Sequence, residues 1–304
     1  MRIEIMGSAA GGGFPQWNCN CPNCHSLRGG SLNGKKRTQT QVAISAGGQS
    51  WFLLNTSPDL RLQIEATPAL HPRKPGRDSP IAGVVITSAD IDQVAGLLSL
   101  RELQSFSVYS TASIRKILRE DNSMLGMLNR IPNQVAWVDI RLNEPFLLVQ
   151  DKDLRSTAFS LGNRYPSYVK DDRAAKLNAN EALCGLMVEA GSKRLAYLPA
   201  VPAVSDTLLT QLESAAVLLF DGTFWSDDEL IRVQGSGATA REMGHIPISG
   251  EEGSLRRLAG LKHPRKIFLH VNNTNPILDE SSPQYKQVRE AGWEVAEDGW
   301  QLEL

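Results

Sequence analysis

Apolar runs bounded by turn residues recur along the chain and predict strands interleaved with helices. Residues 1–6 alternate polar and apolar side chains, whereas residues 81–86 and 216–220 are uninterrupted apolar runs typical of buried strands. The predicted strands cover residues 1–6, 42–45, 51–54, 81–86, 107–110, 134–140, 145–150, 183–188, 195–198, 216–220, 267–271 and 300–304. The predicted helices cover residues 60–66, 113–119, 205–214 and 282–291. This mixture indicates an α/β protein.

The chain lacks a long flexible linker, so we expect a single domain over residues 1–304. If a domain boundary existed, residues 151–182 would be its best position. Within this segment, residues 162–181 are polar and charged, which predicts a loop on the surface. Strand signals continue on both sides of this segment, which favours one domain over two.

Chemistry-bearing residues follow three of the predicted strands. Asp221 ends the run 216–220, His270 lies near the end of the run 267–271, and the polar turn 88–93 with Asp92 follows the run 81–86. An isolated aspartate after a strand is often only a turn former. Three such ends with Asp92, Asp221 and His270 instead predict a site at one edge of a sheet.

Three of the four cysteines stand close together near the start of the chain. Cys19, Cys21 and Cys24 form a C-x-C-x-x-C pattern, which can direct three thiolates at one tetrahedral zinc ion. The surrounding Asn, Pro and Gly residues predict a loop without regular structure, held by the metal. A fourth ligand must then come from another part of the fold, and His270, a side chain after it, or water are the alternatives. Cys184 lies in an apolar run and is expected to be a small core residue.

The bulk composition excludes several classes of protein. The formal net charge is −1, with 32 basic and 33 acidic residues, so no global charge favours nucleic acid. We see neither a signal peptide nor an apolar run of about 20 residues, so membrane insertion is not expected. The cysteines do not form a disulfide framework, which favours a cytoplasmic location.

The polar turn resembles a motif of the metallo-β-lactamase superfamily. Its Ser88-x-Asp90-x-Asp92-Gln93 pattern is similar to the H-x-H-x-D-H turn, and Asp221, Gly244-His245 and His270 follow in the order of the superfamily's later motifs. However, the chain has only five histidines, and none lies in this turn. This ligand count disfavours an ordinary two-zinc hydrolase.

Longer motifs identify a closer resemblance, to the pyrroloquinoline quinone (PQQ) biosynthesis protein B family. They are the segments 7–21, 221–225, 241–245 and 270–279, and the resemblance extends over the whole chain. It implies a four-layer αββα metallo-β-lactamase-like sandwich. It also implies either an iron-dependent hydroxylase of the tyrosine ring in a crosslinked Glu–Tyr precursor, or a carrier of PQQ or its precursor to the periplasm. The implied partners are this peptide-derived precursor, dioxygen, other PQQ biosynthesis proteins and a second copy in a homodimer.

The resemblance also assigns roles to residues. Iron(II) is expected on Asp92, Asp221 and His270, with Asp90 and Gln93 beside them, because hard oxygen ligands with imidazole suit iron. Family members often have a histidine in place of Gln93, so this chain departs from the pattern of two histidines and one carboxylate.

The remaining expectations concern His245, Asn273 and two arginines. His245 is expected to act with Asp92 and His270 in catalysis, as a general acid or base, or only to contact its own loop. Asn273 stands where a related phosphodiesterase group has its fourth zinc ligand. Arg37 and Arg61 are either solvated surface charges or a site for substrate carboxylates.

Overall fold

A computed structural model describes residues 1–148 and 151–304, and these form two compact units. Unit 1 contains Met1–Met6, Gln41–Lys193 and Gly299–Leu304. Unit 2 contains Gly7–Thr40 and Arg194–Asp298. The expectation of a single domain over the whole chain stays a prediction.

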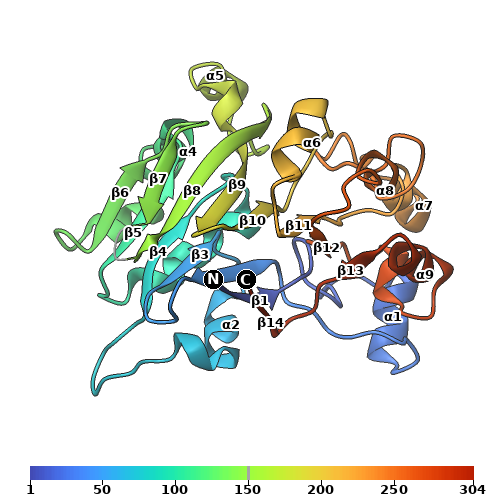
Figure 1. Cartoon of the computed structure of the whole chain (residues 1–304), viewed down its shortest axis with the longest axis horizontal. Coiled ribbons are helices and arrows are strands. Elements are labelled where there is room, and N and C mark those ends of the chain that lie inside the picture. The colour runs from blue at the N-terminus through green and yellow to red at the C-terminus, as the bar shows by residue number, and fades with distance from the viewer. Residues whose placement is uncertain (149–150) are drawn as a thin grey trace. The chain divides into compact units, whose positions relative to one another are not determined.

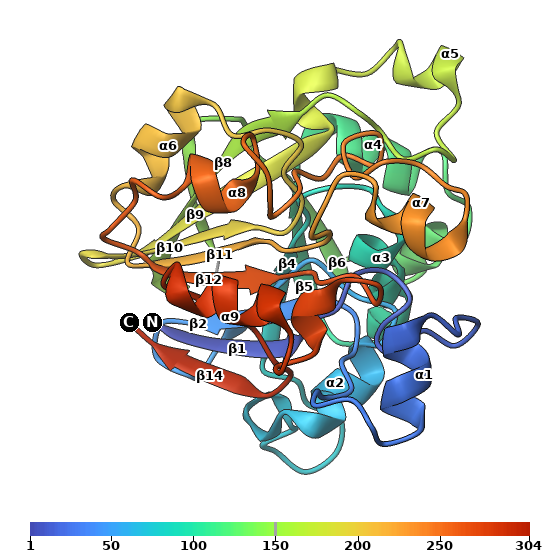
Figure 2. The ribbon, with the colours of Figure 1, turned by 90° about the vertical axis from the view of Figure 1, so that its right-hand side faces the viewer.

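Unit 1 contains a seven-stranded sheet that includes both chain termini (Figure 1). Its outer strand pairs antiparallel with the first strand, and the Met1 ammonium donates to the Leu304 carbonyl at 2.7 Å. Figure 2 shows these two strands side by side at the N and C labels. In spatial order the strands are β14 (Trp300–Glu303), β1 (Arg2–Gly7), β2 (Gln41–Ser45), β3 (Trp51–Leu54), β4 (Ile81–Val85), β5 (Phe106–Ser110) and β6 (Val135–Asp139).

Three antiparallel strands complete the β-structure of unit 1, in the order β9 (Leu183–Ala190), β8 (Asp151–Gly162) and β7 (Pro145–Leu148). Its helices are α2 (Leu60–Ala66), α3 (Ile91–Val94), α4 (Ala112–Arg119) and α5 (Asp171–Ala174), with 3₁₀ turns at Pro68–Leu70, Ala95–Arg101, Leu125–Asn129 and Ala179–Glu181. A buried apolar cluster that includes Leu53, Val84 and Ile117 forms the core between this sheet and α4.

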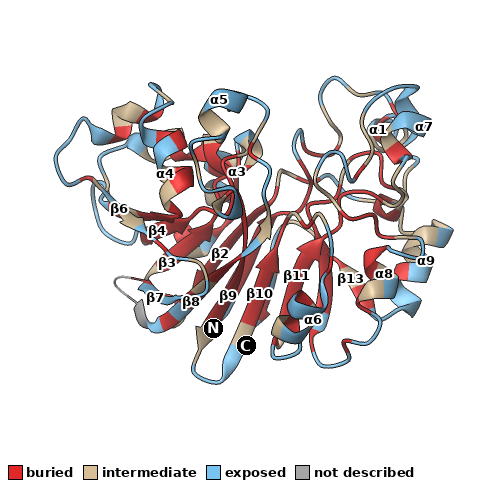
Figure 3. Cartoon of the chain, turned by 90° about the horizontal axis from the view of Figure 1, so that it is seen from above, coloured by how far each residue is buried: buried red, intermediate tan, exposed pale blue. Residues whose placement is uncertain are grey.

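Unit 2 contains four parallel strands in the order β10 (Lys193–Leu198), β11 (Val217–Asp221), β12 (Arg265–Leu269) and β13 (Trp293–Val295). Such strands are covered on both faces, which explains their nearly continuous apolar sequences. In Figure 3, β10 and β11 are mostly red, the colour of buried residues. The helices are α1 (Pro22–Arg28), α6 (Asp206–Leu212), α7 (Glu229–Gln234), α8 (Ser254–Arg257) and α9 (Pro283–Glu290), with a 3₁₀ turn at Pro276–Leu278.

The structure confirms most predicted strands and the four predicted helices, with ends shifted by one or two residues. The prediction that Cys24 lies in a loop without regular structure is wrong, because Pro22 begins helix α1. Strand β8 was not predicted, since its charged residues hide the buried positions Leu154, Ser156 and Ala158. The predicted strand 145–150 ends in residues that lie outside the described part of the chain.

Among the described residues, the longest helices have only eight residues, and no helix is long and apolar enough to cross a membrane.

Candidate metal centre

Two neighbouring parallel strands of unit 2 end at the residues predicted from the sequence. Asp221 is the last residue of β11 and pairs in register with Leu269 of β12. His270 was predicted inside the strand 267–271, but it directly follows the last residue of β12. Its φ is 59°. A positive φ is uncommon for a residue other than glycine and often marks a functional position.

The Asp221 carboxylate is fully buried and accepts four hydrogen bonds. Its Oδ1 accepts from the backbone nitrogen of Thr223 at 3.0 Å and from the Thr223 hydroxyl at 2.6 Å. Its Oδ2 accepts from the Val201 nitrogen at 2.8 Å and contacts Nδ1 of His245 at 2.8 Å. Burial alone would raise the pKa of Asp221, but the imidazoles of His245 and His270 and the Thr223 hydroxyl hold it below its ordinary value.

This network determines which nitrogen of each imidazole carries the proton. Nδ1 of His245 faces a carboxylate oxygen, so it must donate. The Thr223 hydroxyl gives its proton to Asp221, and therefore accepts from Nδ1 of His270 at 2.9 Å. In both rings Nε2 is then the nitrogen with the lone pair, which is the form of histidine that binds a metal ion.

His245 and His270 stack with ring centroids 5.4 Å apart and an angle of 20° between the rings. Together with Asp221 they form one of two groups of potential metal ligands in the described part of the chain, with donor atoms within 4.8 Å of one another. A carboxylate that receives Nδ1–H and thereby orients a ligating histidine is a recurrent arrangement in metal sites. The hydrogen bonds therefore favour His245 and His270 as ligands and Asp221 as the residue that orients them. Direct coordination by Asp221 stays a prediction.

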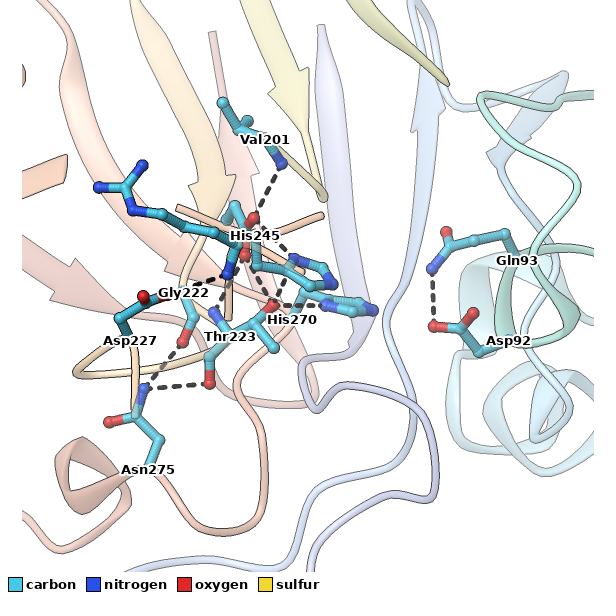
Figure 4. A network of polar contacts seen from close by, with 11 residues as sticks. Asp92, Gln93, Val201, Gly222, Thr223, Asp227, His245, His270 and Asn275 are labelled. Carbon is cyan, nitrogen blue, oxygen red and sulfur yellow. Dashed lines mark hydrogen bonds and ion pairs between the residues drawn. The ribbon is translucent and has the colours of Figure 1, made fainter. Parts of the chain in front are cut away.

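The predicted turn with Asp90, Asp92 and Gln93 belongs to unit 1, where α3 begins after Asp90. Gln93 is buried, and its Oε1 accepts from Nδ2 of Asn55 at 2.5 Å. Its Nε2 donates to Oδ2 of Asp92 at 3.0 Å (Figure 4). Asp90 accepts from the Ser88 hydroxyl at 2.7 Å. Since the amide oxygen of Gln93 already has a donor, the geometry favours Gln93 as a residue that positions Asp92. Its role as a ligand stays a prediction.

Cys19, Cys21 and Cys24 form the second group, and the side chain of Asn273 lies against it. The amide Nδ2 of Asn273 lies 3.1, 3.5 and 3.4 Å from the three sulfur atoms. In a tetrahedral zinc site with Zn–S bonds of about 2.3 Å and a Zn–O bond of about 2.1 Å, the oxygen ligand lies about 3.6 Å from each sulfur. Rotating the amide would put Oδ1 at the same place, because nitrogen and oxygen are assigned from hydrogen bonding. Three thiolates and this amide therefore fit a zinc site.

The segment from Asn273 to Asn275 contacts both groups of potential ligands. Asn23 donates to the carbonyls of Asn273 and Asn275 at 3.1 and 2.9 Å. Asn275 in turn donates to the carbonyls of Gly222 and Thr223 at 3.0 and 3.2 Å. The N-terminal segment with the cysteines therefore lies beside residues 273–275, and the same residues support the turn after Asp221.

Glu229 is a further buried residue of this network, and we did not predict it. Its carboxylate accepts from the Trp225 nitrogen at 2.6 Å and from the Thr274 hydroxyl at 2.6 Å, which ties the turn after Asp221 to the segment beside the cysteines. In the sequence it follows Asp227 and Asp228, and such a run of acidic residues is typical of a solvated surface.

We expect Glu229→Gln to remove a pH dependence of stability. Burial raises the pKa of Glu229 from 4.5 to about 7, so the folded state binds this proton more tightly than the unfolded state. This contribution to stability is present below pH 4.5 and is lost as the pH rises to about 7. Relative to the variant, the wild type should lose on the order of 3 kcal/mol over this range. Urea unfolding of both proteins across the range measures it, and parallel curves would contradict it.

The other histidines and the last cysteine lie outside these groups. Nε2 of His71 contacts the Glu65 carbonyl at 3.0 Å, and Nδ1 of His263 contacts the Ala215 carbonyl at 3.1 Å. Cys184 is fully buried in β9, as expected for a core residue, and burial raises the pKa of its thiol to about 12.

Comparison with known proteins shows the family of this chain. The profile of the family described as "Beta-lactamase superfamily domain" matches residues 50–271. The coenzyme PQQ synthesis protein B of Methylobacterium sp. (strain 4-46) is 43% identical over 304 residues, and that of Xanthomonas campestris pv. campestris (strain B100) is 42% identical over 305 residues. Both alignments cover 100% of each chain.

Solved structures show the same fold. A crystal structure of Zn²⁺-bound PqqB from Methylobacterium extorquens is 43% identical, covers 100% of both chains and has a TM-score of 0.93. A diphosphatase from the PhnP family, at 19% identity and a TM-score of 0.69, shares the fold. The predicted fold class is thereby confirmed as the metallo-β-lactamase fold, with two mixed sheets flanked by helices. The chain therefore belongs to the coenzyme PQQ synthesis protein B family of the metallo-β-lactamase superfamily.

Proposed function

We propose that this chain acts in PQQ biosynthesis as an iron-dependent hydroxylase of the tyrosine ring in the crosslinked Glu–Tyr precursor. The observation that carries the proposal is the pair of imidazoles, His245 and His270, held with Nε2 as the lone-pair nitrogen by Asp221 and Thr223. The whole-length similarity to coenzyme PQQ synthesis protein B supports the pathway.

The donor set suits iron(II). Two imidazoles from His245 and His270 leave room for one carboxylate, and two histidines with one carboxylate is the ligand set of non-haem iron oxygenases. We propose Asp92 as this carboxylate because of its place in the superfamily turn, with Asp221 as the alternative. When bound, iron(II) would supply the activation of dioxygen.

The residues around the two histidines orient the imidazoles and exclude water. Asp221 and Thr223 keep the proton on Nδ1 of each imidazole, so Nε2 stays available to a metal without a change of tautomer. Asp221 is completely buried, which shields this arrangement from water. One oxygen atom of dioxygen enters the ring and the other becomes water, so the reaction also needs a reductant such as ascorbate.

The thiolates supply a separate, structural site. We propose that Cys19, Cys21, Cys24 and Asn273 hold zinc, as the thiolate set favours. The Methylobacterium extorquens relative is described as Zn²⁺-bound, which supports zinc in this family. We further propose that the reaction takes place in the cytoplasm, with other PQQ biosynthesis proteins as partners and a homodimer as the assembly.

An oxygen-consumption assay tests the enzyme proposal. The protein is loaded anaerobically with ferrous iron, and the precursor, ascorbate and air are then added. We expect oxygen uptake that depends on both the precursor and iron, and that disappears in His270→Ala. Uptake at the background rate of the His270→Ala control would contradict a hydroxylase.

Gln93 supports a second candidate, a carrier without a catalytic metal. Its amide is bonded to Asn55 and Asp92, whereas the resemblance described in the sequence analysis implies a histidine at this position. This protein would bind PQQ or its precursor for transport to the periplasm. Stoichiometric iron on the purified protein would count against this candidate.

Gln93→His is expected to raise the affinity for iron(II) about tenfold or more, because an imidazole is a much better ligand than an amide. Anaerobic titration calorimetry measures the affinity. Gln287→His on the exposed face of α9 adds a histidine elsewhere and should change nothing. Equal affinities in all three proteins would show that position 93 does not face the metal.

A further inference from the structure

Arg37 is a buried cation in the strand-like segment next to the first glycine-rich turn. Only 4% of the residue is exposed, which excludes the solvated surface charge considered for it. Its backbone exchanges hydrogen bonds with Phe14 at 2.8 and 2.7 Å. Arg61, the other arginine considered, is exposed on α2 of unit 1.

The guanidinium has few partners for a group with five N–H donors. Nη1 donates to the Ser8 hydroxyl at 3.2 Å, and the buried Nε has no hydrogen-bond partner. Within residues 1–148 and 151–304, no carboxylate lies within ion-pair distance of Arg37. A buried charge therefore faces one neutral hydroxyl.

Glu297 and Asp298, the two carboxylates whose charges act most strongly on Arg37, accept from other donors. Asp298 accepts from Ser8 at 2.8 Å and from the nitrogen and hydroxyl of Thr38 at 2.6 and 2.7 Å. Glu297 pairs with Lys35 at 2.6 Å. Burial lowers the pKa of Arg37, and the more distant charges of Glu297 and Asp298 offset this only in part.

Buried charges in proteins are normally paired, because burying one alone is costly. A guanidinium also matches a carboxylate through two parallel hydrogen bonds, which makes arginine the usual residue for carboxylate recognition. An unpaired buried arginine is thus typical of a site whose anion arrives with a ligand.

The location of Arg37 relates it to the histidine site. Ser8, its hydrogen-bond partner, accepts through its carbonyl from the Val271 nitrogen at 3.0 Å, and Ala9 bridges both Gln39 and Val271. Residues 37–39, 8–10 and 271 therefore lie side by side, and Val271 directly follows His270.

We propose that Arg37 receives a carboxylate group of the substrate and holds it on the flank of the His270 site. The identity of that substrate rests on the proposed function, whereas the carboxylate chemistry rests on Arg37 itself. Because so little of Arg37 is exposed, entry requires a neighbouring segment to shift. The adjacent turn contains Gly12 and Gly13 at φ 95° and 71°, and glycines have the freedom to do so.

The experiment compares Arg37→Met, which keeps length and removes charge, with the control Arg61→Met. The probes are PQQ, which carries three carboxylates, its trimethyl ester, and citrate as an unrelated carboxylate. We expect Arg37→Met to weaken PQQ binding about 10- to 100-fold, consistent with loss of a charged hydrogen-bonded pair. The affinity for the ester should not change, and Arg61→Met should bind like the wild type. Without ligand, Arg37→Met should melt at the same temperature as the wild type or higher.

Two results would overturn the proposal. Unchanged PQQ affinity in Arg37→Met, with a lower melting temperature, would show that the guanidinium is structural. If the wild type binds no PQQ, thermal shift with citrate decides. Stabilisation of the wild type but not of Arg37→Met keeps the carboxylate site and counts against the proposed pathway, whereas no stabilisation of either protein rejects the site.

Discussion

Cys24→Ser is expected to lose the structural zinc and to lower the free energy of unfolding by more than about 3 kcal/mol. Cys24 is fully buried at the start of α1, and its sulfur lies 3.4 Å from the amide of Asn273. The zinc site joins Cys24 to Asn273, which lies 249 positions away in the sequence. Without one of the three thiolates this long-range connection is lost. Metal analysis and thermal unfolding measure the two effects.

Cys184→Ser is the matched control, because Cys184 is equally buried but lies in the apolar strand β9. Burial of a hydroxyl there should cost about 1–3 kcal/mol and leave the zinc content unchanged. The zinc assignment would be rejected if Cys24→Ser kept its zinc, or if both variants lost it equally.

Asp221→Asn is expected to weaken metal binding at the histidine site 10- to 100-fold, in line with the loss of a carboxylate that orients a ligating histidine. The asparagine side chain has one acceptor oxygen instead of two. Its NH₂ group would face the Val201 nitrogen and Nδ1 of His245, which in the wild type both contact Oδ2 of Asp221. Leaving such donors unsatisfied should lower the free energy of unfolding by about 3 kcal/mol. Iron(II) or zinc titration and urea unfolding measure both.

The pH dependence gives a second readout of Asp221→Asn. Because the folded pKa of Asp221 is lowered, its stabilising contribution is complete above the ordinary pKa of 3.8 and is lost as the pH falls through the lower folded value. The variant should lack this acid-induced loss. Asp228→Asn, which removes a carboxylate that is 58% exposed, should resemble the wild type. Wild-type metal affinity in Asp221→Asn would contradict the role assigned to Asp221.

The strands and the ligand-bearing strand ends could be predicted because their signals are local. The run 216–220 is apolar throughout, as a strand of a parallel sheet must be, and Asp221 is the first polar residue after it. The same holds for His270 after β12. Strand β8 gave no such signal, because its first six residues are charged or polar except for Leu154. Helix α1 has only seven residues and lies among Asn, Pro and Gly residues typical of a loop, so only Pro22 indicates its start.

The roles within the site depend on contacts that sequence spacing does not contain. Whether Asp221 binds a metal or orients histidines follows from the Val201 nitrogen, 20 residues away, and from the Thr223 hydroxyl. Glu229 and Arg37 look like ordinary charged residues in the sequence. Only the folded structure shows that both side chains are buried. Glu229 accepts hydrogen bonds at both carboxylate oxygens, whereas the Arg37 guanidinium donates to the Ser8 hydroxyl. Long-range burial of polar groups is therefore the part that the sequence could not reveal.

The central claim, hydroxylation by a metal held on His245 and His270, is tested most directly with isotopically labelled dioxygen. Protein loaded with ferrous iron is mixed with the crosslinked Glu–Tyr precursor, ascorbate and labelled dioxygen, and the product is examined by mass spectrometry. We predict that the tyrosine ring gains labelled oxygen in the wild type and none in His270→Ala. Recovery of unchanged precursor from the iron-loaded wild type, or oxygen derived from water in the product, would contradict the account.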